Sequence, residues 1–289
     1  MSDDRYALLD FGEGRRLERF GPVLLDRPCP AAEGFQRADP RLWLQTDARF
    51  EGRDQEKGRW IEARRLPERW IVAHGPLRFE LKRTDFGHVG LFPEQVDNWK
   101  WIDAQYRRAA TGDAVAARHP KLLNLFAYTG GSTLAGAAAG AEVVHVDAAR
   151  NVVAWARRNA ELSGLAEAPV RWIGEDALKF VKRELRRGNH YDAVILDPPS
   201  YGHGPRGEVW RLSKHLPRLL ALCGELTEGR QAFMLLTCHT PGYDADTLRD
   251  MLLDAVGGSG RAAAMPLTIR SAAGRELPSG VAIRWQHHP

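Results

Sequence analysis

The stretch YDAVILDPPSYG, Tyr191–Gly202, combines an apolar strand with an abrupt end. Its apolar run, Ala193–Leu196, suits a short strand that is covered on both faces of a sheet. An acid, Asp197, follows at once, and the next two residues, Pro198 and Pro199, have no backbone N–H to donate to a neighbouring strand. The strand is therefore predicted to end at Asp197, which places this carboxylate at the rim of a sheet.

Similar apolar runs lie on both sides of this stretch and alternate with helical patterns. They are KLLNLFA, EVVHVD, PVRWIGED and QAFMLLTCH, all within residues 121–239. Strands that alternate with helices are typical of βαβ units, in which helices cover both faces of a parallel sheet. Two further runs near the end of the chain, LTIRS and GVAIRW, predict a terminal hairpin with one antiparallel edge. The predicted fold class is therefore α/β and Rossmann-like.

The first part of the chain, residues 1–95, is predicted to form a small β-rich region. Strand-like pieces such as WIVAHGPLRFEL, Trp70–Leu81, alternate there with glycine and proline turns. A helix is expected next, from Asn98 to Ala110, and it should end before Gly112. The α/β domain is accordingly assigned to residues 96–289.

The composition excludes several classes of protein. With 44% hydrophobic and 27% charged residues the chain is ordinary for a globular protein, and its net charge of +4 permits a polyanionic partner without requiring one. Its three cysteines are widely spaced and form no C-x-x-C pair, which argues against a disulfide framework or a zinc site. There is no signal-peptide pattern and no apolar run of transmembrane length. We expect a cytoplasmic protein that binds neither a membrane nor a metal.

The ends of the predicted strands supply the candidates for a site, because ligands of open α/β sheets bind beyond the carboxyl ends of the strands. After the first run comes NLFAYTGGST, where Gly130 and Gly131 allow a tight turn and a close approach of the backbone to a ligand. The next three runs close on Asp147, Asp176 and Asp197. Each acid alone could be only a helix cap or a turn residue. Three of them at successive strand ends predict an acidic crevice for a nucleoside.

The turn indicates which nucleoside. The segment FAYTGGST, Phe126–Thr133, lacks the G-x-G-x-x-G spacing of a dinucleotide site. A row of carboxylates also suits a cationic ligand without phosphate better than a pyrophosphate. S-adenosylmethionine carries a sulfonium and an ammonium group and meets both conditions.

Three segments, NLFAYTGGSTLAGAAAGAEVVHVDAAR, GEDALKFV and DPPSYG, resemble successive motifs of class I S-adenosylmethionine-dependent methyltransferases. The chain is especially similar to bacterial large-subunit ribosomal RNA methyltransferases of the cytosine-C5 and guanosine-N7 types. This resemblance covers Lys121–Trp285 and extends weakly upstream through GHVGLFPEQVDNWKWI. It implies a mainly parallel seven-stranded sheet with one antiparallel strand, S-adenosylmethionine as the cofactor, and RNA, with ribosomal RNA suspected, as the substrate.

The resemblance also assigns roles to residues. Phe126–Gly130 would wrap the methionine part of the cofactor, Asp147 would hold the ribose, and Asp176 would contact the adenine amine. Asp197 to Tyr201 would grip the target base. The implied cofactor-binding residues are Phe126, Tyr128, Thr129, Gly130, Asp147, Ala148, Asp176, Ala177 and Asp197. The implied catalytic residues are Asp197, Pro198, Pro199, Tyr201 and Cys238.

The chain departs from the family pattern in three respects. Asn124 and Tyr128 stand where many methyltransferases have an acid and a glycine, although the ribosomal group tolerates both. Tyr201 lies one place later than the aromatic residue of the D/N-P-P-Y motif in amino-methylating enzymes. It could stack on a flipped base, or it could be a loop tyrosine packed on its own sheet. The N-terminal region shows no recognisable RNA-binding module of the PUA type.

Cys238, in FMLLTCHT, has two interpretations. Methylation of cytosine at carbon 5 needs a thiolate that adds to carbon 6, and the cytosine-type relatives have a cysteine at this strand end. A cysteine in a core strand is otherwise usually buried packing, and methylation of a nitrogen needs no thiolate. His239 could assist the thiol only if the strand has already ended, because neighbouring strand residues point to opposite faces.

Basic residues near the predicted site could bind phosphates, although such residues on helix faces are often only solvated. They are Arg150, Arg157, Arg158, Lys179, Lys182, Arg183, Arg186, Arg187, His203, Arg206, Arg211, Lys214 and His215. The favoured function is methyl transfer from S-adenosylmethionine to a nucleobase of RNA. A protein or small-molecule methyltransferase, and a non-catalytic RNA-binding protein on the same fold, are the alternatives.

Overall fold

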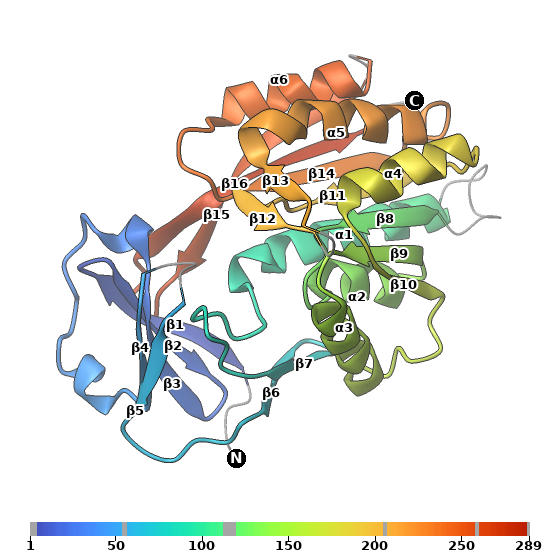
Figure 1. Ribbon diagram of the computed structural model, residues 1–289. Coiled ribbons are helices and arrows are strands. Elements are labelled where there is room, and N and C mark those ends of the chain that lie inside the picture. Colours follow the sequence, from blue (N-terminus) through green and yellow to red (C-terminus); the bar gives the residue numbers. More distant parts are fainter. Residues whose placement is uncertain (1–4, 54–56, 112–119, 205–206, 258–259, 288–289) are drawn as a thin grey trace. The chain divides into compact units, whose positions relative to one another are not determined.

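The computed structural model describes residues 5–53, 57–111, 120–204, 207–257 and 260–287 (Figure 1). The chain divides into two compact units. Unit 1 comprises Met1–Glu94 and Thr268–Ser279, and unit 2 comprises Gln95–Leu267 and Gly280–Pro289. A short segment near the C-terminus thus belongs to the same unit as the N-terminal part of the chain.

Unit 1 is β-rich, as predicted. Its main sheet has five strands in the order β1–β2–β3–β4–β5, and a separate hairpin is formed by β6 and β7. The strands are β1 (Tyr6–Gly12), β2 (Arg15–Phe20), β3 (Val23–Pro28), β4 (Ala48–Glu51), β5 (Arg59–Glu62), β6 (Trp70–His74) and β7 (Leu77–Leu81). Single 3₁₀ turns occupy Pro30–Ala32 and Leu42–Gln45, and a third, Pro93–Gln95, spans the point in the sequence where unit 2 begins. Neighbouring strands are antiparallel except β3 and β4, which are parallel.

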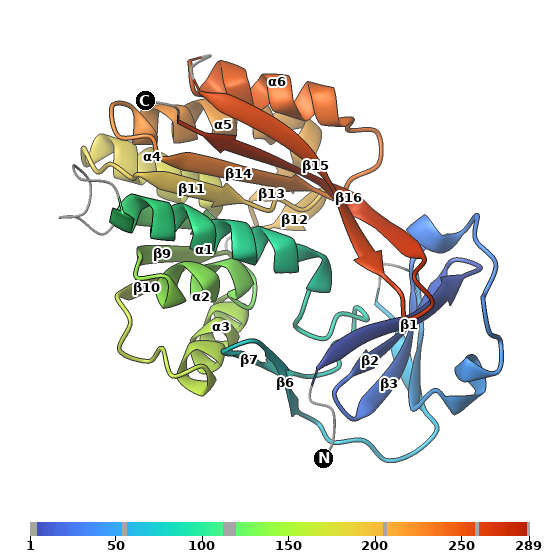
Figure 2. The ribbon, with the colours of Figure 1, turned by 180° about the vertical axis from the view of Figure 1, so that it is seen from behind.

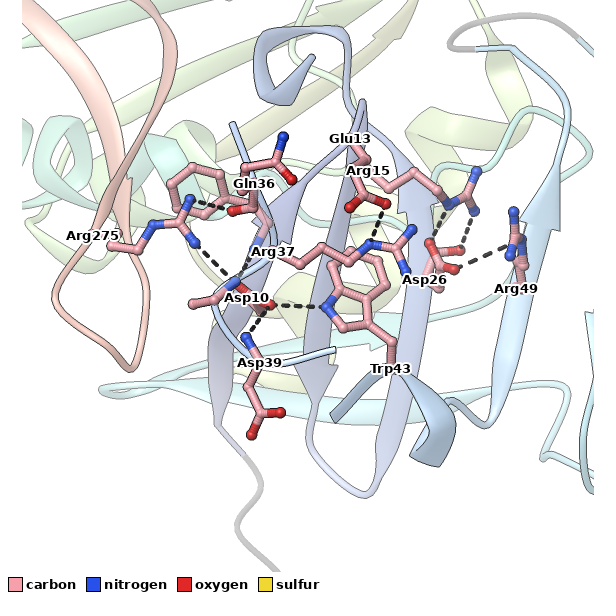
Figure 3. Close-up of polar contacts among 12 residues, drawn as sticks. Asp10, Glu13, Arg15, Asp26, Gln36, Arg37, Asp39, Trp43, Arg49 and Arg275 are labelled. Carbon is pink, nitrogen blue, oxygen red and sulfur yellow. Dashed lines mark hydrogen bonds and ion pairs between the residues drawn. The ribbon is translucent and has the colours of Figure 1, made fainter. Parts of the chain in front are cut away.

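A buried acid in β1, Asp10, organises part of unit 1 (Figure 3). Its side chain accepts hydrogen bonds from Trp43 Nε1 (2.9 Å) and from the backbone amides of Ala38 (3.1 Å) and Asp39 (3.2 Å). Its Oδ1 also lies 3.2 Å from a guanidinium nitrogen of Arg275. Burial raises the pKa of Asp10, but the donors around it, the Trp43 indole foremost, outweigh burial and leave the pKa below its ordinary value. The carboxylate therefore joins β1 to two segments that are distant in sequence.

Unit 2 is an α/β domain with a mainly parallel seven-stranded sheet, which confirms the predicted fold class. The strand order is β10–β9–β8–β11–β14–β16–β15, and β16 runs antiparallel to β14. The strands are β8 (Lys121–Leu125), β9 (Glu142–Asp147), β10 (Val170–Gly174), β11 (Ala193–Leu196), β14 (Phe233–Cys238), β15 (Arg261–Arg270) and β16 (Glu276–Gln286). A small hairpin is formed by β12 (Tyr201–His203) and β13 (Val209–Arg211).

Six helices accompany the described part of this sheet (Figures 1 and 2). They are α1 (Val96–Thr111), α2 (Gly131–Ala138), α3 (Arg150–Leu162), α4 (Ala177–Arg186), α5 (Leu212–Thr227) and α6 (Ala245–Ala255). One large hydrophobic cluster joins apolar residues of α4, α5 and α6 to one face of the sheet. On the other face, Trp101 and Tyr106 of α1 contact Phe233 of β14 edge-on.

The order of the strands reverses between β8 and β11. From β8 the chain proceeds outward to β9 and β10, and it then continues on the other side of β8 with β11 and β14. Leu125 of β8 lies in register with Leu196 of β11, so the two strands end side by side. Ligands of open α/β sheets bind at such a reversal point, beyond the carboxyl ends of the strands. The residues after Leu125 and Leu196 are therefore the place to look for a site.

Two elements differ in extent from the expectation. The helix expected from Asn98 begins at Val96, directly after a 3₁₀ turn, and Gly112 lies outside the described residues. The terminal hairpin is much longer than its two apolar runs, since β15 has 10 residues and β16 has 11. None of the helices that the structure describes has both the length and the apolar character needed to span a membrane.

Candidate active site

The turn after β8 contains three residues with left-handed backbone. The φ angles are 54° at Phe126, 47° at Tyr128 and 92° at Gly130. Glycine adopts this conformation easily, whereas a phenylalanine or a tyrosine is strained by it. Strained residues persist only where their surroundings hold them, and they are typical of ligand sites.

Asp147, the last residue of β9, holds the turn in this shape. Its Oδ2 accepts a hydrogen bond from the amide of Tyr128 (2.9 Å), and its Oδ1 accepts one from the amide of Ala149 (2.9 Å). Asn159 of α3 fixes the turn from a second side by donating to the carbonyl of Thr129 (2.9 Å). Burial raises the pKa of the Asp147 carboxyl, although its two backbone hydrogen bonds oppose the shift. The acid expected to hold a ribose is thus also the residue that shapes the glycine turn.

Asn124, which stands where many relatives have an acid, belongs to a buried network of neutral groups. Its Nδ2 donates to Thr133 Oγ1 (2.9 Å), and this hydroxyl lies 2.9 Å from His145 Nδ1. Burial lowers the pKa of His145 to about 3, so the imidazole is neutral at physiological pH. An acid at position 124 would bring a buried charge into this network, and the asparagine avoids that cost.

Asp176 caps α4, as one of its two interpretations predicted. Its Oδ1 accepts a hydrogen bond from the amide of Lys179 (2.9 Å), and Ala177 is the buried first residue of the helix. Ala148 lies next to Asp147 and is partly exposed. The contacts of Asp176, Ala177 and Ala148 with an adenine or a ribose stay predictions.

Asp197 follows β11 and is held by three donors. Its Oδ1 accepts from Thr237 Oγ1 (2.5 Å) and lies 3.2 Å from His239 Nε2, and its Oδ2 accepts from Gln95 Nε2 (3.1 Å). Burial raises the pKa of Asp197, but His239 and the hydrogen bonds from His239, Thr237 and Gln95 outweigh burial and lower it. With 30% of its side chain exposed, Asp197 is an ionised carboxylate at the reversal point of the sheet.

Cys238 is the last residue of β14 and packs on the same face of the sheet as Met234 and Leu236. It is paired with Val281, so it lies on the opposite face from Thr237, whereas His239 follows the end of the strand. Only 3% of Cys238 is exposed, and it packs in the same cluster as Leu248 of α6. Burial raises the pKa of its thiol. These observations favour the packing interpretation, and a nucleophilic role for Cys238 stays a prediction.

The loop after Asp197 is tied to the glycine turn by an aromatic residue, Trp210. Pro198 is buried and Pro199 is exposed, and the carbonyl of Pro199 accepts a hydrogen bond from Trp210 Nε1 (2.7 Å). The ring of Trp210 packs on that of Phe126, with 4.8 Å between the centroids. The loop expected to hold the target base and the turn expected to hold the cofactor therefore have a common support.

Tyr201 lies in the small hairpin, opposite Arg211. Tyr201 is half exposed. Arg211 and Val209, on the same face of the hairpin, are also exposed, while Trp210 faces inward. The tyrosine therefore presents ring surface to solvent beside the Asp-Pro-Pro segment, as stacking on a base would require.

The predicted phosphate-binding surface is partly neutralised by ion pairs. The pairs are Arg158–Glu161, Lys179–Glu208, Arg183–Glu175 and Arg187–Glu184. Arg211 and Lys214 are exposed at the start of α5. Arg206 lies outside the described residues. No cluster of three or more acids, histidines or cysteines suited to a metal occurs among the residues that the structure covers.

Among the residues of the site that were not predicted as members of it are Gln95, Thr237 and Trp210. Gln95 precedes α1 and reaches Asp197 across 102 positions of sequence, and Trp210 supports both loops. A glutamine and a buried tryptophan carry no local sign of such a role, since their contacts arise only when α1 and the hairpin pack on the sheet.

Comparison with known proteins supports a common family. A family model described as S-adenosylmethionine-dependent methyltransferase matches residues 36–245. A crystal structure of the SAM-dependent methyltransferase from Agrobacterium tumefaciens has a TM-score of 0.89 and 38% sequence identity, with 100% of this chain and 91% of that chain covered.

Two curated relatives are named as ribosomal RNA large subunit methyltransferases. The chain is 30% identical over 217 residues to a ribosomal RNA large subunit methyltransferase K/L from Shewanella frigidimarina, covering 72% of this chain and 28% of the relative. It is 34% identical over 140 residues to a ribosomal RNA large subunit methyltransferase I from Aeromonas salmonicida, covering 47% of this chain and 35% of the relative. The aligned region thus spans about a third or less of the length of these two relatives.

Proposed function

Because the chain belongs to the S-adenosylmethionine-dependent methyltransferase family, we propose that it methylates a nucleobase of RNA. The observation that carries this proposal is the pairing of an ionised carboxylate, Asp197, with an exposed aromatic residue, Tyr201, at the ends of one short stiff loop. Enzymes that act on a flipped base grip its polar edge by hydrogen bonds and its face by stacking. The names of the relatives make ribosomal RNA the first RNA to test.

The site suits S-adenosylmethionine in its shape and charge. In this proposal the left-handed turn of Phe126, Tyr128 and Gly130 lets the backbone approach the cofactor closely, and Asp147 offers a carboxylate to the ribose hydroxyls. Asp176, with Ala177 beside it, is assigned to the adenine. When bound, the cofactor supplies an electrophilic methyl group on a positively charged sulfur.

The residues around the target have distinct tasks in this proposal. Asp197 accepts a hydrogen bond from the polar edge of the base, and Tyr201 stacks on its face. Pro198 and Pro199 stiffen the segment between them, and Trp210 fixes that segment through the Pro199 carbonyl. Holding the base in one orientation before reaction lowers the entropic part of the barrier.

Replacement of Asp147 by alanine should weaken cofactor binding. We expect a loss of roughly 1.5–3 kcal/mol, or about 10- to 150-fold in Kd, because a charge-assisted hydrogen bond to the ribose is removed. The variant also loses the acceptor that fixes the Tyr128 amide. Isothermal titration calorimetry with S-adenosylmethionine measures the change, and Asp254→Ala, at an exposed acid of α6, is the control. An unchanged Kd in a folded Asp147→Ala protein would remove the ribose assignment.

The substrate class is tested by methyl transfer from tritiated S-adenosylmethionine to separated pools of ribosomal RNA, transfer RNA, protein and small metabolites. Label in the ribosomal RNA pool, located by mass spectrometry of the digested nucleosides, is the expected result. A 5-methylcytidine product would restore the nucleophilic role of Cys238. Label only in protein or in metabolites would refute the RNA proposal, and no transfer to any pool would favour a non-catalytic RNA-binding protein.

A further inference from the structure

A chain of side-chain hydrogen bonds runs from β16 to the Asp197 carboxylate. Arg284 of β16 donates from Nε and Nη2 to Asn98 Oδ1, at 3.0 and 2.8 Å. Asn98 of α1 donates from Nδ2 to Gln95 Oε1 at 2.8 Å. Gln95 donates from Nε2 to Asp197 at 3.1 Å, and the same nitrogen lies 3.4 Å from His239 Nε2. We call Arg284, Asn98 and Gln95 the relay.

The two amide groups of the relay have only one possible orientation. A guanidinium can only donate, so the oxygen of Asn98 must face Arg284 and its NH₂ group must face Gln95. By the same reasoning the oxygen of Gln95 faces Asn98, and its NH₂ group faces Asp197. Asn98 is 0% exposed and Gln95 is buried, so neither amide can turn over without leaving buried polar atoms unsatisfied. The orientation at Asp197 is therefore set from β16.

The Asp197 carboxylate indicates which nitrogen of His239 carries the proton. Asp197 is an acceptor, so the His239 Nε2 that lies 3.2 Å from it carries a proton, and Nδ1 is the other ring nitrogen. One third of the His239 side chain is exposed, at the same rim as Asp197. Three donors stabilise the ionised form of Asp197, which makes that carboxylate a poor acceptor of a further proton. Imidazole is the side chain suited to proton exchange near neutral pH.

We propose that His239 accepts the proton that the target atom loses on methylation, and that Gln95, Asn98 and Arg284 are its positioning residues. The proposal rests on the proposed function and narrows it, because the target atom must carry a hydrogen. In the balanced step the target atom gains the methyl group, the sulfur keeps the electron pair of the broken carbon–sulfur bond, and the displaced proton moves to His239 Nδ1. Asp197 then faces an imidazolium, and its charge stabilises that cation.

His239→Ala is the first test, with tritiated S-adenosylmethionine and in vitro transcribed large-subunit ribosomal RNA. We expect kcat to fall about 10²- to 10⁴-fold, the usual contribution of a positioned general base, with cofactor affinity within about threefold of wild type. Added imidazole should restore part of the rate, because it can enter the space of the lost side chain and accept the proton. His190→Ala, at an exposed histidine of the same unit, is the matched control.

Gln95→Leu tests the relay. The side chain keeps its bulk but loses the donor to Asp197, so we expect a fall in kcat of about 10- to 100-fold from misorientation of Asp197 and His239. Added imidazole should not rescue this variant, since His239 is still present. Circular dichroism and thermal unfolding of both variants establish that the fold is retained.

Nitrogen-15 NMR of the histidine rings gives a readout that needs no substrate. The neutral ring of His239 should be protonated on Nε2, and Gln95→Leu should shift its signals. The proposal would be overturned if the neutral ring of His239 were protonated on Nδ1, or if the His239→Ala rate were within threefold of wild type. It would also be overturned if the rate lost in His239→Ala were not rescued by imidazole. A 7-methylguanosine product would overturn it too, because that product forms without loss of a proton from the target atom. Failure of the wild type to methylate any RNA would refute the proposed function, and the NMR result would still decide the protonation of His239.

Discussion

Asp197→Ala is expected to reduce the rate of methyl transfer by about 10³-fold, because in the proposed reaction this carboxylate supplies the charge near the reacting group and positions the base. The substitution also leaves three donors, Thr237, His239 and Gln95, without their common acceptor. Initial rates with tritiated S-adenosylmethionine and ribosomal RNA measure kcat. Calorimetry on the same preparation measures the Kd of the cofactor, which separates a loss of chemistry from a loss of binding.

Two variants control this experiment. Asp197→Asn keeps the size of the side chain and removes its charge, so its rate should lie between those of Asp197→Ala and wild type. Asp254→Ala removes an exposed acid of α6 and should leave the rate unchanged. A folded Asp197→Ala protein that binds cofactor and works within tenfold of wild type would show that this carboxylate does not hold the target.

The low pKa of Asp197 has a consequence at acidic pH. A carboxylate whose pKa is lower in the folded chain than in the unfolded chain stabilises the fold at pH values above its ordinary pKa, about 3.9. That contribution is lost as the pH falls below this value and through the folded-state pKa. Asp197 therefore stays ionised throughout the neutral range, where the proposed reaction would occur.

The sheet and its acids were predictable from the sequence because their signals are local. An apolar run bounded by turn residues identifies a strand, and an acid directly after the run lies at its carboxyl end, as Asp147 and Asp197 do. The reversal of strand order between β8 and β11 carries no such signal, and it was not predicted.

Contacts between distant segments were not predictable from local patterns. The face on which Cys238 lies depends on where β14 ends, and only the pairing of Cys238 with Val281 shows that the strand continues to it. Gln95 acquires a role at Asp197 because α1 packs on the sheet. Likewise, Ser271 in the terminal hairpin forms a bridge with Leu8 of β1, across most of the chain.

Asp10→Ala is expected to destabilise unit 1 by roughly 3–4 kcal/mol, because it removes one carboxylate that serves five donors. The indole of Trp43 and the amide of Ala38 lose their acceptor, and Arg275 loses its ion pair (Figure 3). Hydrogen exchange measured by mass spectrometry should show faster exchange in residues 36–45 and in 268–279. Unit 2 is the internal reference, since its strands should keep their protection from exchange.

The matched control for this experiment is Asp39→Ala. Asp39 is an exposed acid of the same segment, and its backbone amide, which donates to Asp10, survives the substitution. Its own carboxylate accepts only the local hydrogen bond from the Arg41 amide among the contacts described, so we expect a cost of about 0.5–1 kcal/mol. If the Asp10→Ala and Asp39→Ala proteins showed the same hydrogen exchange in residues 36–45 and 268–279, the buried carboxylate of Asp10 would not be what joins the terminal hairpin to β1. A large difference would mean that Asp10 fastens the last strands of the chain to the first.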